Sequence, residues 1–401
     1  MSALVRALRS AVLRAPGGDP AEAAVAAPAE ASAERWGRVA VGAALVLCAL
    51  GVLMVYSSSS VRAARDAGDG TLYLKRQLAW AGIGLGAMVV CMRVPLSFWR
   101  TNARPLLVLS LALLAAVLVV GTEINGGRRW FRLGSFSFQP SELAKVSCLV
   151  FVSAWLCDRR DSLHEFRRGF LPAAAAVGGM AVLILVEPDF GTALFVGSLG
   201  TALLIVGGAR MKHLLALAAC SLPVLAWSVW TRLETIQERF QFMGGADQAH
   251  YQVRQGLVAL GSGGLLGRGP GAGTAKLFFL PEASSDFILP MLGEELGFAG
   301  TLLVILLYAA FVRAGARVCL RCIDRDPFAF LLSLGATLWV GLQACINIAV
   351  TTACAPTKGI ALPFVSLGGS GLVTLMAATG ILYAAARRAD DAALALEGRV
   401  S

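Results

Sequence analysis

Long apolar runs separated by short polar segments dominate the pattern of this chain. Each run approaches the ~20 residues that an α-helix needs to cross a bilayer. We count ten such runs, at residues 39–57, 77–92, 104–121, 140–157, 170–186, 191–208, 214–230, 287–312, 327–353 and 370–386. Some are short, so we expect tilted helices or helices interrupted at glycine and proline. The pattern predicts an all-α polytopic membrane protein with about ten transmembrane helices.

The polar stretches around these runs define the organisation of the chain. Residues 1–37 are rich in Ala, Pro and Glu and predict a disordered tail, and 389–401 form a second tail. Residues 38–388 then constitute one membrane domain. Its longest connection, 231–286, lies between the seventh and eighth predicted helices. Because it contains aromatic and apolar residues as well as many glycines, we interpret it as an ordered functional loop.

Composition agrees with a membrane protein. Hydrophobic residues make up 57% of the chain and charged residues 15%, whereas a soluble domain carries roughly 25% charge. The formal net charge is +10, but no basic patch is interleaved with aromatic residues. This argues against a nucleic-acid partner and leaves anionic lipid or a phosphate-bearing substrate.

The familiar soluble-enzyme motifs are missing from the sequence. It contains no H-E-x-x-H, no G-x-S-x-G and no His/Cys cluster with metal-ligand spacing. The glycine-rich stretch GSGGLLGRGPGAGTAK lacks the G-K-[ST] ending of a P-loop, which argues against nucleotide binding. No dedicated metal site is predicted, although a divalent cation carried with a phosphate substrate stays open.

Charge bias predicts the orientation. Ten spans place both termini on one side, and a cytoplasmic N-terminus puts 21 of the 35 basic residues inside, 13 outside and Lys145 within a span. The positive-inside rule favours this arrangement. The 231–286 loop then lies outside.

Carboxylates at the membrane edge are the first candidates for chemistry, because charge there is costly and tends to mark function. In LPEASSDFILPMLGEELG, Pro281 is expected to open a helix with Glu282 and Asp286 on one face. A half-desolvated Asp286 could serve as a general base, or could simply cap the span. Glu294 and Glu295 are interpreted as buried ion-pair partners rather than catalysts.

Cations are the second group of candidates. Arg128, Arg129 and Trp130 lie at the predicted outer edge, where paired arginines favour an anionic ligand. Lys145 lies three residues after Glu142 in the fourth span, which fits a structural ion pair and a cavity cation equally. With Lys358 in the last outside loop, the cations are predicted to converge on Asp286. A lipid-linked pyrophosphate requires such an arrangement.

Five stretches of this sequence resemble the SEDS family of bacterial cell-wall polymerases, which includes FtsW, RodA and SpoVE. They are NGGRRWFRLGSFSFQPSELAK, EPDFGT, HYQVRQGLVALGSGGLLGRG, LPEASSDFILPMLGEELGFAG and PTKGIALPFVSLGGSG. The resemblance covers roughly residues 38–388. It implies a ten-helix fold with a large extracytoplasmic loop before the eighth helix.

The resemblance also implies an activity and a site. SEDS proteins polymerise lipid II into glycan strands beside a class B penicillin-binding protein. The essential aspartate of the family matches Asp286, and its other motif residues match Arg129, Trp130, Lys145 and Lys358. We expect Glu282 to belong to the substrate-binding set by tuning the aspartate.

The implied setting is a bacterial inner membrane at the division septum, with other division proteins as partners. PTKG before LPFVS favours the division-type branch over the RodA-like elongation type. A lipid II flippase using the same cavity is the alternative from another functional class, and a non-catalytic division scaffold is a third.

Overall fold

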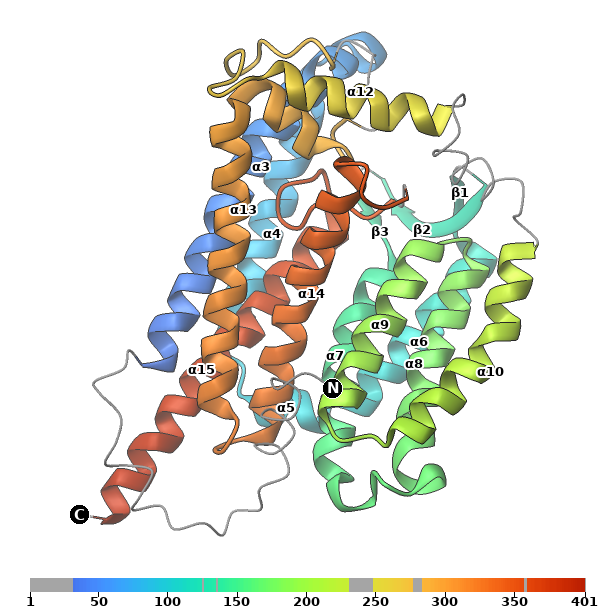
Figure 1. Ribbon diagram of the computed structural model, residues 1–401, viewed down its shortest axis with the longest axis vertical. Coiled ribbons are helices and arrows are strands. Elements are labelled where there is room, and N and C mark those ends of the chain that lie inside the picture. The colour runs from blue at the N-terminus through green and yellow to red at the C-terminus, as the bar shows by residue number, and fades with distance from the viewer. Residues whose placement is uncertain are drawn as a thin grey trace.

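The computed structural model describes residues 32–124, 126–134, 136–230, 248–276, 283–356 and 359–400. Helices make up most of this part of the chain (Figure 1). The helices are α3 (Ala33–Ala67), α4 (Leu72–Arg93), α5 (Leu96–Thr101), α6 (Ala103–Val120), α7 (Pro140–Asp158), η1 (Arg160–Ser162), η2 (Phe166–Phe170), α8 (Leu171–Val186), α9 (Phe190–Val206), α10 (Met211–Trp230), α12 (Gln248–Ser262), α13 (Ile288–Cys322), α14 (Pro327–Thr351) and α15 (Gly369–Val400). The strands are β1 (Thr122–Ile124), β2 (Gly127–Leu133) and β3 (Phe136–Phe138).

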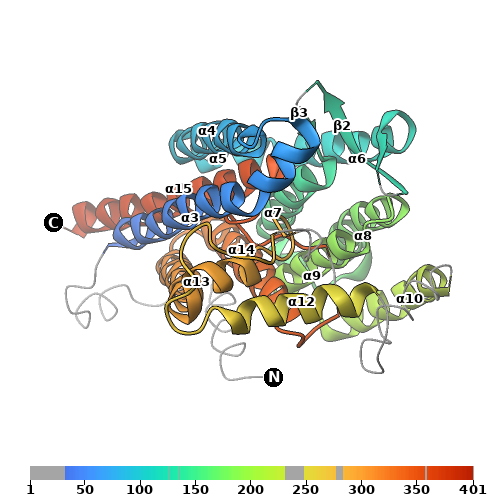
Figure 2. The same cartoon turned by 90° about the horizontal axis from the view of Figure 1, so that it is seen from above.

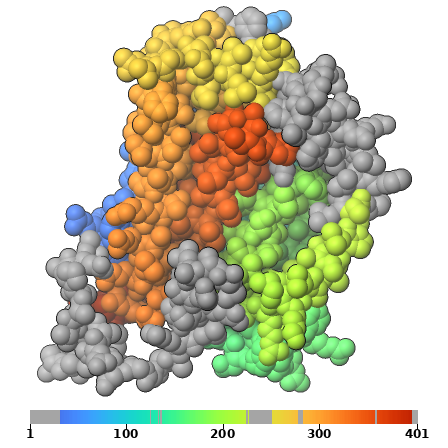
Figure 3. Space-filling view, in the orientation of Figure 1, coloured from blue at the N-terminus to red at the C-terminus, as the bar shows by residue number. Residues whose placement is uncertain are grey.

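The long helices form two groups that meet along α7 and α14. One group contains α3, α4, α13 and α15, and the other contains α6, α8, α9 and α10 (Figures 1 and 2). In the space-filling view, α14 and the loop after it lie between the orange surface of α13 and the green surface of the second group (Figure 3). The large buried side chain of Trp339, on α14, belongs to the packed centre.

One end of the bundle carries the irregular structure. The small antiparallel sheet β1–β2–β3 lies there, and α12 crosses the same end (Figures 1 and 2). The sheet register places Glu123 opposite Arg128 and Arg132 opposite Ser137. At the other end, the carboxylate of Asp390 in α15 accepts hydrogen bonds from the backbone N–H groups of Ala33 and Glu34, 2.9 and 2.8 Å long. The start of α3 and the last part of α15 therefore lie side by side.

Local sequence explains several helix starts. Asp189 caps α9 by accepting a 3.0 Å hydrogen bond from the backbone N–H of Thr192. Asp326 caps α14 in the same way, and Pro327 follows it at the first helical position. Pro140 likewise occupies the first turn of α7. These residues define where α7, α9 and α14 begin.

A helix occupies each of the ten apolar runs predicted from the sequence. Among the described helices, seven are long and apolar enough to cross a membrane, and α9 is a shorter apolar helix. The prediction of a polytopic all-α membrane fold is confirmed, while the number of crossings stays a prediction.

The apolar run predicted from residue 287 coincides with the start of α13, but the expectation that Pro281 opens this helix is wrong. Residues 283–287 form turns, and α13 begins only at Ile288. Asp286 therefore precedes the helix instead of lying on its face, and the predicted helical pairing with Glu282 does not apply. Glu282 and Lys358 lie outside the described residues, as does 231–247 of the long loop.

Candidate functional site

A cavity of about 230 Å³ opens where the two helix groups meet the sheet. Its walls come from segments that are far apart in the sequence: β2, α7, α9, the 283–287 turns, α14, the loop before α15 and the start of α15. The sequence-predicted residues that line it are Arg129, Trp130, Lys145 and Asp286. The fold therefore brings these four residues together.

Asp286 is half-buried, and hydrogen bonds to the backbone on both sides of the cavity hold its segment. The side-chain amide of Asn347 donates to the carbonyl oxygen of Asp286 over 2.9 Å and to that of Ile360 over 2.8 Å. The hydroxyl of Ser366 donates to the carbonyl of Ser285 over 2.6 Å. A Cβ added at Gly359 would lie 3.3 Å from Asp286 Oδ2, so the carboxylate lies closely against that backbone.

Arg129 projects from β2 into the same cavity. Its Nε donates to the carbonyl oxygen of Glu187 over 2.9 Å, and an Nη donates to the carbonyl oxygen of Pro188. These bonds occupy two of the five N–H groups of a guanidinium. Both partners are neutral carbonyl oxygens, so these contacts leave the positive charge of the guanidinium uncompensated. Its remaining N–H donors therefore suit an anionic ligand.

Lys145 is buried on α7 and combines both roles that the sequence allowed. Its ammonium lies 2.7 Å from a carboxylate oxygen of Glu142 and also lines the cavity. The rings of Phe195 and Trp339 lie 5.6 and 5.4 Å from it, within the range of cation–π attraction. The ion pair makes the buried charge tolerable, and the cavity gives it access to a ligand.

Arg128 does not join this cluster. It is exposed, lies 3.8 Å from Glu123 on the neighbouring strand, and does not line the cavity. The prediction that Arg128 converges with the other cations is therefore wrong. Adjacent residues of a strand point to opposite sides, which separates Arg128 from Arg129.

Two polar residues of α14 escaped the sequence analysis. Gln343 and Asn347 are buried four residues apart, and the amide of Gln343 donates to the carbonyl of Ala361 over 2.9 Å. Together they hold the loop before α15 against the Asp286 segment. The sequence did contain a signal for them, because both lie in a predicted apolar span, where polar side chains are costly and tend to mark a functional site.

Glu187, at the turn between α8 and α9, is fully buried, and neither of its carboxyl oxygens has a hydrogen-bond partner among the described residues. Burial raises the pKa of Glu187 to about 8, and the nearby charge of Asp189 adds to the rise while Arg129 opposes it. The neutral acid is therefore favoured in the folded protein at neutral pH.

We expect Glu187→Gln to remove a pH-dependent loss of stability. The folded protein holds a proton that the unfolded chain releases near its usual pKa of 4.5, so wild-type stability falls as the pH rises from there to about 8. Since one pKa unit corresponds to ~1.4 kcal/mol, the variant should be more stable at pH 8 by about 2 kcal/mol or more. Thermal unfolding at several pH values measures this. The exposed Glu123→Gln serves as control, and a Gln variant less stable than wild type at pH 8 contradicts the assignment.

Among the described residues, no group of three or more His, Cys, Asp or Glu side chains is placed to hold a metal ion. The cavity is lined by two cations, Arg129 and Lys145, by three carboxylates, and by aromatic rings that include Trp130. Of the carboxylates, Glu142 is paired with Lys145 and Asp189 accepts hydrogen bonds from Thr192, while Asp286 is the third. This combination suits an anionic ligand with a hydroxyl group to be deprotonated.

Fold and cavity together define an integral membrane protein with a charged site at one end of its helical bundle. The profile of the FtsW/RodA/SpoVE family, described as cell cycle protein, matches residues 38–391. The chain belongs to this family.

Individual relatives agree with this assignment. The chain is 38% identical over 355 residues to the probable peptidoglycan glycosyltransferase FtsW of Geobacter sp. (strain M18), covering 87% of this chain and 96% of the relative. It is 36% identical over 348 residues to stage V sporulation protein E of Bacillus subtilis (strain 168), covering 86% and 94% of the two chains.

Solved structures resemble the fold over most of its length. One chain comes from a study of how a peptidoglycan synthase complex coordinates polymerization and crosslinking. It superposes with a TM-score of 0.69 at 27% identity, covering 87% of this chain and 97% of that one. The rod shape determining protein RodA of Thermus thermophilus gives a TM-score of 0.61 at 27% identity, with 87% and 95% coverage.

Proposed function

We propose that this protein is a peptidoglycan glycosyltransferase that polymerises lipid II into glycan strands during septal cell-wall synthesis and cell division. The observation that carries the proposal is that Asp286, Arg129 and Lys145 line one and the same cavity. The relatives named probable peptidoglycan glycosyltransferase FtsW support both the activity and the division-type assignment. RodA-like elongation activity is the closest alternative.

The reaction is a displacement at an anomeric carbon. The growing strand carries undecaprenyl pyrophosphate on that carbon, and the incoming lipid II offers the 4-hydroxyl of its N-acetylglucosamine. Asp286 accepts the hydroxyl proton as the new C–O bond forms and the bond to pyrophosphate breaks. The single displacement inverts the anomeric configuration.

The cations act on the leaving group. Arg129 and Lys145 stabilise the negative charge that develops on the pyrophosphate, and Trp130 supplies an apolar wall beside it. Lys358 and Glu282 belong to the same substrate-binding set in this proposal, on the strength of their sequence positions. A divalent cation bound with the pyrophosphate would add to this charge stabilisation.

The proposed setting is the bacterial plasma membrane at the septum, with both termini cytoplasmic and the α12 end outside. A class B penicillin-binding protein is the proposed partner, and the resemblance to a chain from a peptidoglycan synthase complex supports this. Labelling of single cysteines in 231–286 and in 313–326, which comprises the end of α13 and the turn before α14, checks the orientation, because the two segments must react from opposite sides.

Purified protein with its transpeptidase partner and labelled lipid II tests the function. We expect a ladder of glycan strands on a gel. If lipid II stays unpolymerised but moves between the leaflets of a vesicle, the flippase alternative is correct. The clustering of charge at one end of the bundle speaks against that alternative, since transport requires polar groups through the membrane midplane.

A further inference from the structure

α13 is broken near its start. Gly297 adopts φ 69° and ψ −165° within an otherwise helical segment, a left-handed conformation that favours glycine. A Cβ at this position would overlap the backbone nitrogen of Gly267. The residues before the break, 288–296, therefore form a short helix whose direction is not set by the rest of α13.

A loop from the extracytoplasmic segment fills the break. The backbone of the loop forms hydrogen bonds with N–H and C=O groups of α13 that would be paired within the helix if α13 were unbroken. Four bonds make the connection: Arg268 N–H to Glu294 C=O (3.0 Å), Gly269 N–H to Glu295 C=O (3.0 Å), Phe298 N–H to Gly264 C=O (2.8 Å) and Ala299 N–H to Leu265 C=O (3.0 Å). The short helix is thus held by this loop.

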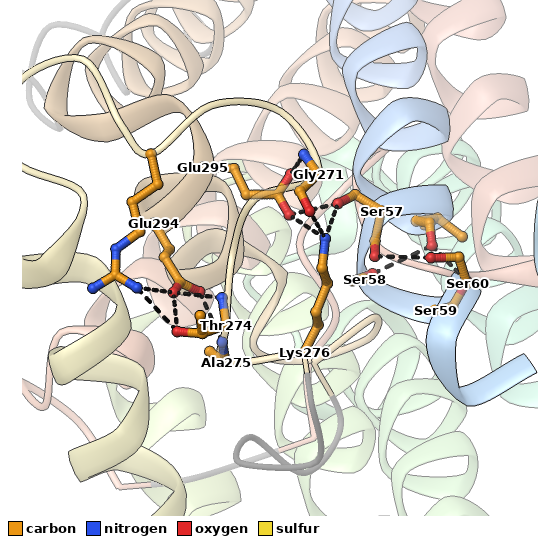
Figure 4. Close-up of polar contacts among 12 residues, drawn as sticks. Ser57, Ser58, Ser59, Ser60, Gly271, Thr274, Ala275, Lys276, Glu294 and Glu295 are labelled. Atoms are coloured by element: carbon orange, nitrogen blue, oxygen red, sulfur yellow. Dashed lines mark hydrogen bonds and ion pairs between the residues drawn. The ribbon is translucent and has the colours of Figure 1, made fainter. Parts of the chain in front are cut away.

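Side chains reinforce the same contact (Figure 4). Glu294 is buried, accepts hydrogen bonds from the backbone and hydroxyl of Thr274 at 2.8 and 2.9 Å, and lies 3.3 Å from Arg268. Glu295 is buried and lies 3.1 Å from the ammonium of Lys276. The sequence-based interpretation of both glutamates as ion-pair partners is confirmed.

One junction joins this assembly to α3. The hydroxyl of Ser57 donates to Glu295 Oε1 and accepts from Lys276 Nζ over 3.2 Å. The Lys276 and Glu295 side chains are only 8% and 1% exposed. Besides each other and Ser57, they bond to the backbone of Gly271, whose N–H donates to Glu295 Oε2 over 2.9 Å and whose carbonyl accepts from Lys276. Loss of any one of the three side chains therefore removes a polar partner from a buried charge. In Figure 4 they meet between the loop and the α3 helix.

α12 completes the assembly. A Cβ on Gly256 would lie 3.1 Å from the ring of Phe287 and 3.4 Å from Pro290, and one on Gly263 would overlap the carbonyl of Gly293. α12, the loop to residue 276 and residues 283–296 therefore pack closely, and we call them the α12 unit. This unit carries Asp286, whereas Arg129 and Lys145 belong to β2 and α7.

We propose that Lys276, Glu295 and Ser57 are positioning residues, which fix the α12 unit on α3 and thereby set the place of Asp286 relative to Arg129 and Lys145. The inference rests on the proposed function for Asp286. General-base catalysis requires the base within hydrogen-bond reach of the hydroxyl, and a displacement of about 1 Å can cost ~10²-fold in rate. The contacts of Asn347 and Ser366 tether the other side of the same segment.

Lys276→Met and Ser57→Ala test the junction. We expect kcat for lipid II polymerisation to fall by about 10–100-fold while KM changes by less than about threefold, because the cations that bind substrate are untouched. Lys276→Arg keeps the ion pair and should restore most of the rate. Lys75→Met is the matched control, since Lys75 makes an exposed ion pair with Asp69 of 2.9 Å and should leave the rate unchanged.

Hydrogen exchange supplies a readout that does not depend on activity. In wild type, the amides of Arg268, Gly269, Phe298 and Ala299 are hydrogen-bonded across the break, and Lys276→Met should speed their exchange while the amides of α7 stay protected. Unchanged exchange and a wild-type rate in both variants overturn the proposal. The proposal is also overturned if the polymerisation rate falls only in proportion to the amount of folded protein. If exchange changes but wild type makes no strands, the proposed function fails and the junction stands as a structural device.

Discussion

Asp286→Asn should abolish most lipid II polymerisation, lowering the rate by about 10²–10⁴-fold, which is the usual contribution of a general base. Asn is nearly the same size and still accepts a hydrogen bond, but it cannot take a proton at neutral pH. The segment is held through its backbone by Asn347 and through Ser285 by Ser366, so folding and membrane insertion should be retained. Strand synthesis by purified variants measures the loss.

Two controls sharpen this result. Asp286→Glu keeps the proton acceptor but moves it by about one carbon–carbon bond toward the closely packed backbone of Gly359, so we expect severe impairment. Glu282→Gln should be milder if Glu282 only tunes the aspartate. A near-normal rate for Asp286→Asn would show that Asp286 is not the general base. The flippase and scaffold functions would then again be alternatives to polymerisation.

Arg129→Ala should reduce kcat/KM for lipid II by about 10–100-fold, the loss expected for a charge-assisted hydrogen bond of ~1.5–3 kcal/mol. Arg129→Lys should recover only part of this, because an ammonium cannot reproduce the planar fork that also binds the carbonyls of Glu187 and Pro188. Steady-state kinetics with labelled lipid II measures both variants.

Arg128→Ala provides the matched control in the adjacent position. It removes the same charge from the same strand, but Arg128 pairs with Glu123 and does not line the cavity. We expect a rate close to that of wild type. Equal losses at the two arginines would mean that general surface charge, rather than contact with pyrophosphate, governs substrate use.

The sequence was most informative about the membrane-spanning parts, because few backbone structures are possible in lipid. Apolar runs of nearly bilayer length predicted the helices, because backbone groups in lipid must be paired within the segment. Charges such as Lys145 and Asp286 stood out against these runs, and the cavity brings both together. Both residues could be singled out as site candidates because charge is costly in or beside a membrane.

Tertiary contacts between remote segments were not predictable in the same way. Pro281 suggested an earlier helix start, but hydrogen bonds from Asn347 and Ser366 hold residues 285 and 286 in turns. The break at Gly297 depends on a loop that begins some thirty residues earlier. Neither partner is visible in a local pattern, since both lie beyond the range of helical periodicity.

The structure of the Asp286→Asn protein with its transpeptidase partner and lipid II tests the central claim most directly, because the variant binds substrate without consuming it. The account predicts pyrophosphate density in the 230 Å³ cavity, in contact with Arg129 and Lys145. It also predicts the sugar 4-hydroxyl at about 2.6–3.2 Å from residue 286. Pyrophosphate bound instead at the opposite end of the bundle, in the cavity lined by Arg100 and Arg104, would contradict the account.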